Sequence, residues 1–154
     1  MRNLLIVALV VLSTSLTVVS QNKTIRQKHF NLNKGVAIQG YDVVSYFTQK
    51  KPVKGKKEIA LNAEGVVYYF SSEANKELFR KNYTAYEPQY GGWCAYAMGN
   101  SAEKVEIDPE TFKIINGKLY LFYNAYFNNT LTTWNKNEVN LKSKADKNWT
   151  QMFK

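Results

Sequence analysis

The sequence is poor in the side chains that build most metal centres and nucleophilic sites. Among its 154 residues there is one cysteine, Cys94, and one histidine, His29. No intramolecular disulfide can form, so packing has to stabilise the fold. A thiol nucleophile needs a general base, and a thiol redox pair needs a second cysteine. No pair of carboxylates stands out for acid–base catalysis either, so a non-enzymatic protein is expected.

A long apolar run occurs only at the N-terminus. Arg2 precedes this run, and Val18 and Ser20 supply the small residues of a signal-peptidase site. The run is short and interrupted by hydroxyl side chains, whereas a membrane-spanning helix needs about 20 apolar residues. We therefore expect residues 1–20 to be a signal peptide cleaved before Gln21. The protein would then be exported, periplasmic or secreted, with no membrane span after cleavage; an uncleaved anchor is the alternative.

The rest of the chain has the composition of one globular domain. Hydrophobic residues make up 45% and charged residues 21% of the sequence, so disorder is not the default expectation. Residues 21–34 are polar and basic and are expected to be a flexible lead-in. Residues 35–154 then form a single domain, in which we find no internal repeat and no low-complexity linker.

Basic residues outnumber acidic ones, which gives a formal net charge of +9. Five lysines gather in one short segment: Lys50, Lys51, Lys54, Lys56 and Lys57. Such a cluster is able to attract nucleic acid or an anionic surface. It lacks the interleaved aromatic residues that bind single strands. We therefore expect a solvated loop that opposes aggregation, and no nucleic-acid partner.

Local patterns predict an α+β fold: a small antiparallel sheet with β-hairpins, packed against several short helices and a C-terminal helix. Asn116-Gly117 between two apolar segments is the strongest signal, because it favours a hairpin with a type I′ turn. A second hairpin is expected around Glu64-Gly65, followed by a helix that Ser71 or Ser72 caps. The expected strands are residues 35–39, 58–63, 66–70, 112–115 and 118–123, and the expected helices begin near residues 42, 71, 125 and 138.

Aromatic residues crowd two segments, near residues 41–47 and 90–97. Such side chains bind apolar or haem-like molecules in a concave site, and they also form ordinary cores in which their polar atoms are satisfied. Core packing is favoured here, and Asp42 is favoured as a helix N-cap over a ligand. The candidate ligand-binding residues are Tyr41, Asp42, Tyr46, Tyr90, Trp93, Cys94 and Tyr96.

Three segments together resemble the YHS domain family: 40–47 with the sequence GYDVVSYF, 67–73 with VYYFSSE, and 90–97 with YGGWCAYA. Segments 116–120 and 144–149 also resemble exported single-domain members. The resemblance covers nearly all of the expected domain. It implies a compact fold in which a β-hairpin leads into a short helix.

The resemblance also indicates where metal-binding relatives carry thiolates, the soft ligands that copper(I) and zinc prefer. These positions are Ser45, Ser71 and Asn75 in this sequence. Hydroxyl and amide groups do not replace thiolates for soft metals, so the resemblance implies the scaffold without its ligand set. We therefore expect no cofactor, and a module that binds an unknown small ligand or protein partner.

Two alternatives remain for the single thiol. Cys94 and Met98 are four residues apart, which suits one face of a helix, so with His29 they are the candidate ligands of a copper or zinc site. Cys94 is also the candidate nucleophile of a thiol enzyme, although no sequence signal brings His29 to it. The simpler interpretation is that Cys94 is a small buried hydrophobic residue and that Met98 fills a gap in the core.

Overall fold

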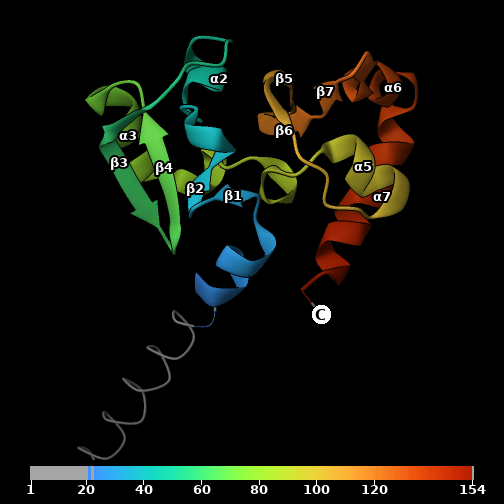
Figure 1. The fold of residues 1–154 in the computed structure, drawn as a ribbon, viewed down its shortest axis with the longest axis horizontal. Coiled ribbons are helices and arrows are strands. Elements are labelled where there is room, and N and C mark those ends of the chain that lie inside the picture. The colour runs from blue at the N-terminus through green and yellow to red at the C-terminus, as the bar shows by residue number, and fades with distance from the viewer. Residues whose placement is uncertain (1–20, 22, 154) are drawn as a thin grey trace, which may run out of the picture.

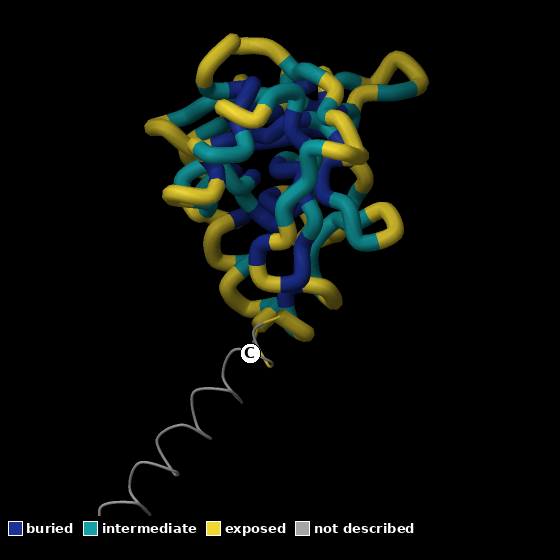
Figure 2. Tube along the Cα trace, turned by 90° about the vertical axis from the view of Figure 1, so that its left-hand side faces the viewer, coloured by how far each residue is buried: buried dark blue, intermediate teal, exposed yellow. Residues whose placement is uncertain are grey.

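The computed structural model describes residue 21 and residues 23–153, so the expected signal peptide over residues 1–20 lies outside the described residues. The described chain has the expected α+β fold, with one four-stranded sheet and two separate hairpins among short helices (Figure 1). Buried residues fill the centre and exposed segments surround it (Figure 2). Within the described chain, no helix has the length and apolarity that a membrane crossing requires.

The first half of the domain contains the four-stranded sheet, in the order β1-β2-β4-β3. β2 and β4 are parallel neighbours, and β3 and β4 form an antiparallel hairpin. The elements are β1 (Leu32–Asn33), β2 (Val36–Ala37), the 3-10 helix η1 (Ile38–Gly40), α2 (Ser45–Thr48), β3 (Lys56–Ala63), β4 (Val66–Phe70), α3 (Glu73–Lys81) and α4 (Tyr83–Tyr86).

The second half contains two hairpins and the longest helix. β5 pairs with β6, and the short strands β7 and β8 pair with each other. The elements are the 3-10 helix η2 (Gln89–Gly92), α5 (Ala95–Ser101), β5 (Asp108–Ile115), β6 (Lys118–Phe122), β7 (Asn124–Ala125), β8 (Asn128–Asn129), α6 (Thr130–Lys136) and α7 (Glu138–Gln151).

The two halves are copies of one structural unit, which corrects the expectation of no internal repeat. The β3–β4 and β5–β6 hairpins have the same register at one constant offset, so that Ala60↔Tyr69 in the first recurs as Phe112↔Leu121 in the second. Each hairpin also has a register irregularity at the corresponding place, in the first half of its leading strand. We call residues 36–86 the first unit and residues 88–151 the second unit.

The backbone before each hairpin repeats as well. Ile38, Gln39 and Gly40 have φ angles of 50°, 52° and 81°, and the corresponding residues 90–92 have 55°, 59° and 85°. The next segment is tied down in the same way, because Asp42 N–H donates to Val53 O at 2.8 Å and Cys94 N–H donates to Val105 O at 3.0 Å. Few identical side chains accompany this shared backbone, which is why the sequence alone does not reveal the repeat.

The units differ after the hairpin. In the first unit, Ser72 caps α3 directly after β4, with its hydroxyl accepting from Asn75 N–H at 3.2 Å. In the second unit, the β7–β8 hairpin is inserted before α6, which Asn129 caps through Leu131 N–H at 3.0 Å. The last helix differs too, since α4 has 4 residues and α7 has 14.

The units pack one on the other. One face of the β5–β6 hairpin, formed by Phe112, Ile114, Leu119 and Leu121, belongs to the same core cluster as the buried residues of the first unit. The opposite face carries Tyr120 and Phe122, which pack with Trp134, Leu141 and Ala145 in a second cluster. The second hairpin is therefore covered on both faces, and the first is covered on one.

Several expected boundaries were wrong. The lead-in expected to be flexible is helical over residues 23–29 and buries Arg26, because this side chain finds a carboxylate on the domain. The strand expected over 35–39 ends at Ala37, where the left-handed backbone begins. The helix expected from residue 125 begins at Thr130, because residues 124–129 form the inserted hairpin.

Candidate functional site

Asp42 is a fully buried carboxylate in the segment before α2. Its Oδ1 accepts a hydrogen bond from Val44 N–H at 2.9 Å. Its Oδ2 accepts three, from the Ser71 backbone N–H at 2.8 Å, the Ser71 hydroxyl at 2.6 Å and the Asn75 amide at 2.7 Å. The negative charge is thus surrounded by donors, the arrangement that makes a buried charge tolerable.

The three positions at which the resemblance to metal-binding YHS domains led us to look for thiolates meet at Asp42. Ser71 and Asn75 bind its side chain, and the Ser45 hydroxyl donates to its backbone carbonyl at 2.7 Å. Ser71 follows β4, and Asn75 lies in the first turns of α3. The network therefore joins the segment before α2 to the end of the sheet and to α3. It replaces the expected role of Asp42 as the N-cap of a helix that begins at residue 42, since α2 begins at Ser45.

Cys94 occupies in the second unit the place of Asp42 in the first. Its Sγ accepts from Tyr123 N–H at 3.3 Å, just as Asp42 accepts from Ser71 N–H. The Thr130 hydroxyl lies 3.4 Å from Sγ and donates to the Tyr123 carbonyl at 2.8 Å. Because the hydroxyl proton is used there, the thiol is left as the donor to Thr130 Oγ1.

A pocket of about 300 Å³ lies beside Cys94. Tyr96 also lines it, so the structure brings these two candidate residues to one place. The remaining wall comes from α5 and the segment after it, from Tyr123, from β8 and from the start of α6: Ala97, Asn100, Ser101, Glu103, Val105, Tyr123, Asn128 and Thr130. The Cys94 side chain forms part of the wall, but 0% of its surface is exposed.

Because Cys94 is buried, we expect its thiol to react slowly with alkylating reagents. We expect iodoacetamide to alkylate native Cys94 at least about tenfold more slowly than the same chain in guanidinium chloride, because reagent access requires local opening. Mass spectrometry of the modified chain over time measures both rates. Equal rates at neutral pH would contradict the burial and would favour the thiol-enzyme alternative.

Two of the candidate tyrosines are core residues. Tyr46 is fully buried and donates its hydroxyl to the Pro109 carbonyl at 2.8 Å. Tyr90 is buried and donates to Asp146 Oδ1 at 2.9 Å. Burial is the first cause that raises the pKa of both hydroxyls, and the Asp146 hydrogen bond adds to it at Tyr90. Both polar atoms are satisfied inside the protein.

The other two candidates lie nearer the surface, in separate places. Tyr41 donates to Glu110 Oε1 at 3.3 Å, and the Lys54 ammonium lies 3.9 Å from the centre of its ring. Trp93 donates its indole N–H to the His29 carbonyl at 2.7 Å. Its ring therefore fastens the N-terminal helix to the second unit. The candidate aromatics do not converge on one shared cavity among the described pockets.

The three candidate metal ligands have different surroundings. Cys94 and Met98 belong to different core clusters. The His29 ring stacks near Phe153, with centroids 5.0 Å apart, and its Nδ1 lies 3.3 Å from Lys104 Nζ. Desolvation, together with the charge of Lys104, lowers the pKa of this imidazole. Over residues 21 and 23–153, no group of three or more His, Cys, Asp or Glu side chains is placed to hold a metal ion.

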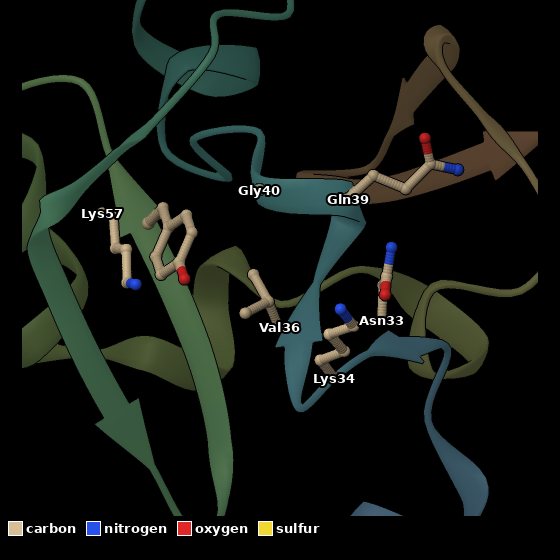
Figure 3. A pocket seen from close by; sticks show the side chains of 7 residues that line it. Asn33, Lys34, Val36, Gln39, Gly40 and Lys57 are labelled. Carbon is tan, nitrogen blue, oxygen red and sulfur yellow. The ribbon is translucent and has the colours of Figure 1, made fainter.

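A larger hollow lies elsewhere, on the open face of the first unit (Figure 3). Its volume is about 470 Å³. Val36, Gly40 and Tyr69 give it apolar surface, and its polar lining residues are Asn33, Lys34, Gln39 and Lys57. None of these lining residues of the described chain is acidic and two are lysines, so the lining carries only positive formal charge.

The backbone at the edge of this hollow is unusual. Ile38 and Gln39 have positive φ angles, which are strained for side chains with a Cβ and most of all for a β-branched one. Gly40 follows with a φ of 81°, and a Cβ on it would lie 3.2 Å from the Tyr69 ring. Gln39 remains exposed and donates to the Ile107 carbonyl at 3.0 Å. Residues 90–92 have the same backbone in the second unit, so this conformation belongs to the shared unit.

Comparison of the two units explains why the hollow is open. Val67 and Tyr69 are part-buried, but the corresponding Leu119 and Leu121 are fully buried against the first unit. Gly91 corresponds to Gln39, and a Cβ there would lie within 3.0 Å of Phe30 and Trp149. The second unit thus has this surface covered by the first unit, Phe30 and α7. Within the described chain, nothing fills the corresponding space in the first unit.

No sequence signal identifies this hollow. Lys57 belongs to the lysine-rich segment expected to be a solvated loop, and Lys34 belongs to the expected lead-in. Parallel pairing of β2 with β4 brings them to one surface, and single-sequence patterns do not predict such pairing between distant strands. A search among family models, curated proteins and solved structures finds no significant match to this chain.

Proposed function

We propose that this protein is an exported, non-enzymatic YHS-like module that binds a small anionic molecule in the hollow of the first unit. The observation that carries the proposal is the pairing of two lysines and two side-chain amides with apolar surface, without a carboxylate among the lining residues. The proposed relationship to the YHS family is supported by the β3–β4 hairpin that leads directly into α3, as the resemblance implies.

The chemistry of the lining sets the class of ligand. Ammonium groups and amide N–H groups are donors, and charge-assisted hydrogen bonds favour a carboxylate or phosphate. Val36 and the Tyr69 ring offer apolar contact beside these donors. A small ligand with one anionic group and one flat apolar part matches both, and 470 Å³ lies within the range of small-molecule sites.

The test uses a matched pair of probes. Phenyl phosphate should raise the melting temperature and bind in calorimetry, whereas neutral phenol should bind at least about tenfold more weakly. Lys34→Gln and Lys57→Gln should each weaken phenyl phosphate binding by about tenfold, because each removes one charged donor.

Lys118→Gln is the control, since Lys118 is exposed at the start of β6 and does not line the hollow. It should leave binding unchanged while removing the same net charge. Equal binding of phenol and phenyl phosphate, or equal losses in all three variants, would contradict an anion site in this hollow.

A further inference from the structure

The inserted β7–β8 hairpin carries two adjacent aromatic residues at its tip. Tyr126 is 92% exposed and Phe127 is 112% exposed, the highest values among the exposed large hydrophobic residues of the described chain. The neighbouring side chains, at Asn124, Ala125 and Asn128, carry no charge. A pair of aromatic rings is therefore held out in water on an uncharged support.

The backbone at this tip is strained to present these rings. The register Asn124↔Asn129 and Ala125↔Asn128 leaves Tyr126 and Phe127 as the two turn residues, with φ angles of 51° and 63°. A two-residue turn of this kind strongly prefers Asn-Gly, because bulky residues rarely adopt positive φ. The protein uses that preferred pair in its other hairpin, at Asn116-Gly117.

The fold does not need the hairpin. In the first unit, the chain passes from β4 to the cap of α3 with no insertion, although its β3–β4 hairpin has the same register as β5–β6. The tip contributes nothing to either core cluster of the described residues. Strain and exposed apolar surface that are dispensable to the fold point to a contact outside the molecule.

The surroundings indicate the chemistry of that contact. Figure 1 places β7 at the upper end of the molecule, the same end as α2 and the loop that follows it. This loop carries the exposed Lys50, Lys51 and Lys54. The chain as a whole has a formal net charge of +9. Aromatic rings and lysines at one end of a protein match the interface of an anionic lipid bilayer, where rings sit at headgroup depth and ammonium groups meet phosphate.

We propose that the Tyr126-Phe127 tip and the lysine loop at the same end of the molecule together dock the protein on the surface of an anionic membrane. The rings enter the headgroup region, and Lys50 and Lys51 supply electrostatic attraction. The contact is peripheral and salt-sensitive, because it buries two side chains and no spanning segment. This site is separate from the proposed ligand hollow, and neither depends on the other.

Co-sedimentation with vesicles tests the proposal. The protein should sediment with vesicles of phosphatidylcholine mixed with phosphatidylglycerol and should stay in solution with pure phosphatidylcholine. Added salt should release it. The chain beginning at Gln21 is run beside the full chain, since it keeps every described residue and lacks the N-terminal apolar run, which could bind lipid by itself.

The decisive variant is Tyr126→Asn combined with Phe127→Gly. It installs the preferred turn pair, so the fold should be retained, and melting temperature and circular dichroism verify this. Binding should fall by at least about tenfold. Lys50→Gln and Lys51→Gln should each weaken binding by about fivefold. The matched control is Val139→Ser, which removes another exposed apolar side chain, 86% exposed on α7, and should leave binding unchanged.

Three results would overturn the proposal. The chain from Gln21 could stay in solution with both vesicle types, which would leave a protein as the partner of the tip. The turn variant could bind as well as the wild type. Val139→Ser could reduce binding as much as the turn variant, which would indicate unspecific adsorption.

Discussion

Asp42→Ala should lower the free energy of unfolding by about 3–5 kcal/mol, the largest effect we expect of any single substitution. The substitution leaves the Ser71 hydroxyl, the Ser71 N–H and the Asn75 amide without their acceptor in a site that water does not reach. Unsatisfied buried donors are costly, and these lie where α2, β4 and α3 meet. Urea unfolding followed by circular dichroism measures the loss.

The internal repeat supplies a matched control. Cys94→Ala removes the corresponding side chain of the second unit, and it should cost about 1 kcal/mol because a thiol makes weak hydrogen bonds. Asp42→Asn should lie between the two, since the amide keeps one acceptor and places N–H groups against other donors. If Asp42→Ala destabilises no more than Cys94→Ala, the network around Asp42 does not have the role described here.

Arg26→Met should destabilise the protein by about 3 kcal/mol, the second largest effect. Arg26 joins the N-terminal helix to Glu87, which also accepts from the Tyr68 hydroxyl at 2.7 Å. Both partners are nearly buried, with side chains 10% and 11% exposed. Desolvation alone lowers the pKa of Arg26, but the hydrogen bond and charge of Glu87 outweigh it and raise the pKa. Without the guanidinium, the Glu87 carboxylate stays nearly buried with no cationic partner. The N-terminal helix also loses its ionic attachment to the domain.

The exposed Arg80–Glu77 pair provides the comparison, with side chains 63% and 45% exposed. Arg80→Met should cost no more than about 0.5 kcal/mol, because water screens this pair. The double variant Arg26→Met/Glu87→Gln should lose much less unfolding free energy than the sum of the losses in the two single variants, because the two side chains are in contact. Equal effects of Arg26→Met and Arg80→Met in urea unfolding would contradict the buried pair.

The sequence predicts those elements whose cause is local. The bounds of β4, Val66–Phe70, agree with the expected strand, because β-branched and aromatic residues follow a turn there. The turn at Asn116-Gly117 has the positive φ angles that a type I′ turn requires. Ser72 caps α3, as its position before the helix indicates.

Features that depend on distant partners were not predictable in this way. The partner of Arg26 is 61 positions away in the sequence, so nothing local marks the lead-in as an ordered segment. Ile38 adopts a backbone conformation that its residue type disfavours, and only the surrounding fold holds it there. The role of Asp42 in joining three elements likewise depends on side chains beyond its own segment.

The candidate site illustrates the same limit. The aromatic segments that the sequence singled out contribute residues to the core. Tyr46 and Tyr90, for example, are buried there and their hydroxyls are hydrogen-bonded. The open hollow instead combines lysines and amides that carry no pattern in the sequence. Composition indicates which side chains are chemically able to bind a ligand. The pairing of strands decides which of these side chains share a surface.

The repeated architecture has an evolutionary consequence. Duplication of a gene followed by fusion of the two copies is expected to produce two linked units of this kind. After fusion, the two units are packed against each other and are no longer equally exposed. The second unit buries one face of its β5–β6 hairpin on the first unit, and that face is apolar. The β3–β4 hairpin of the first unit keeps one uncovered face. Equivalent places then diverge in chemistry, as an acid in one copy and a thiol in the other illustrate. We therefore expect the functional residues of this protein at positions where the two units differ, and not in the backbone that they share.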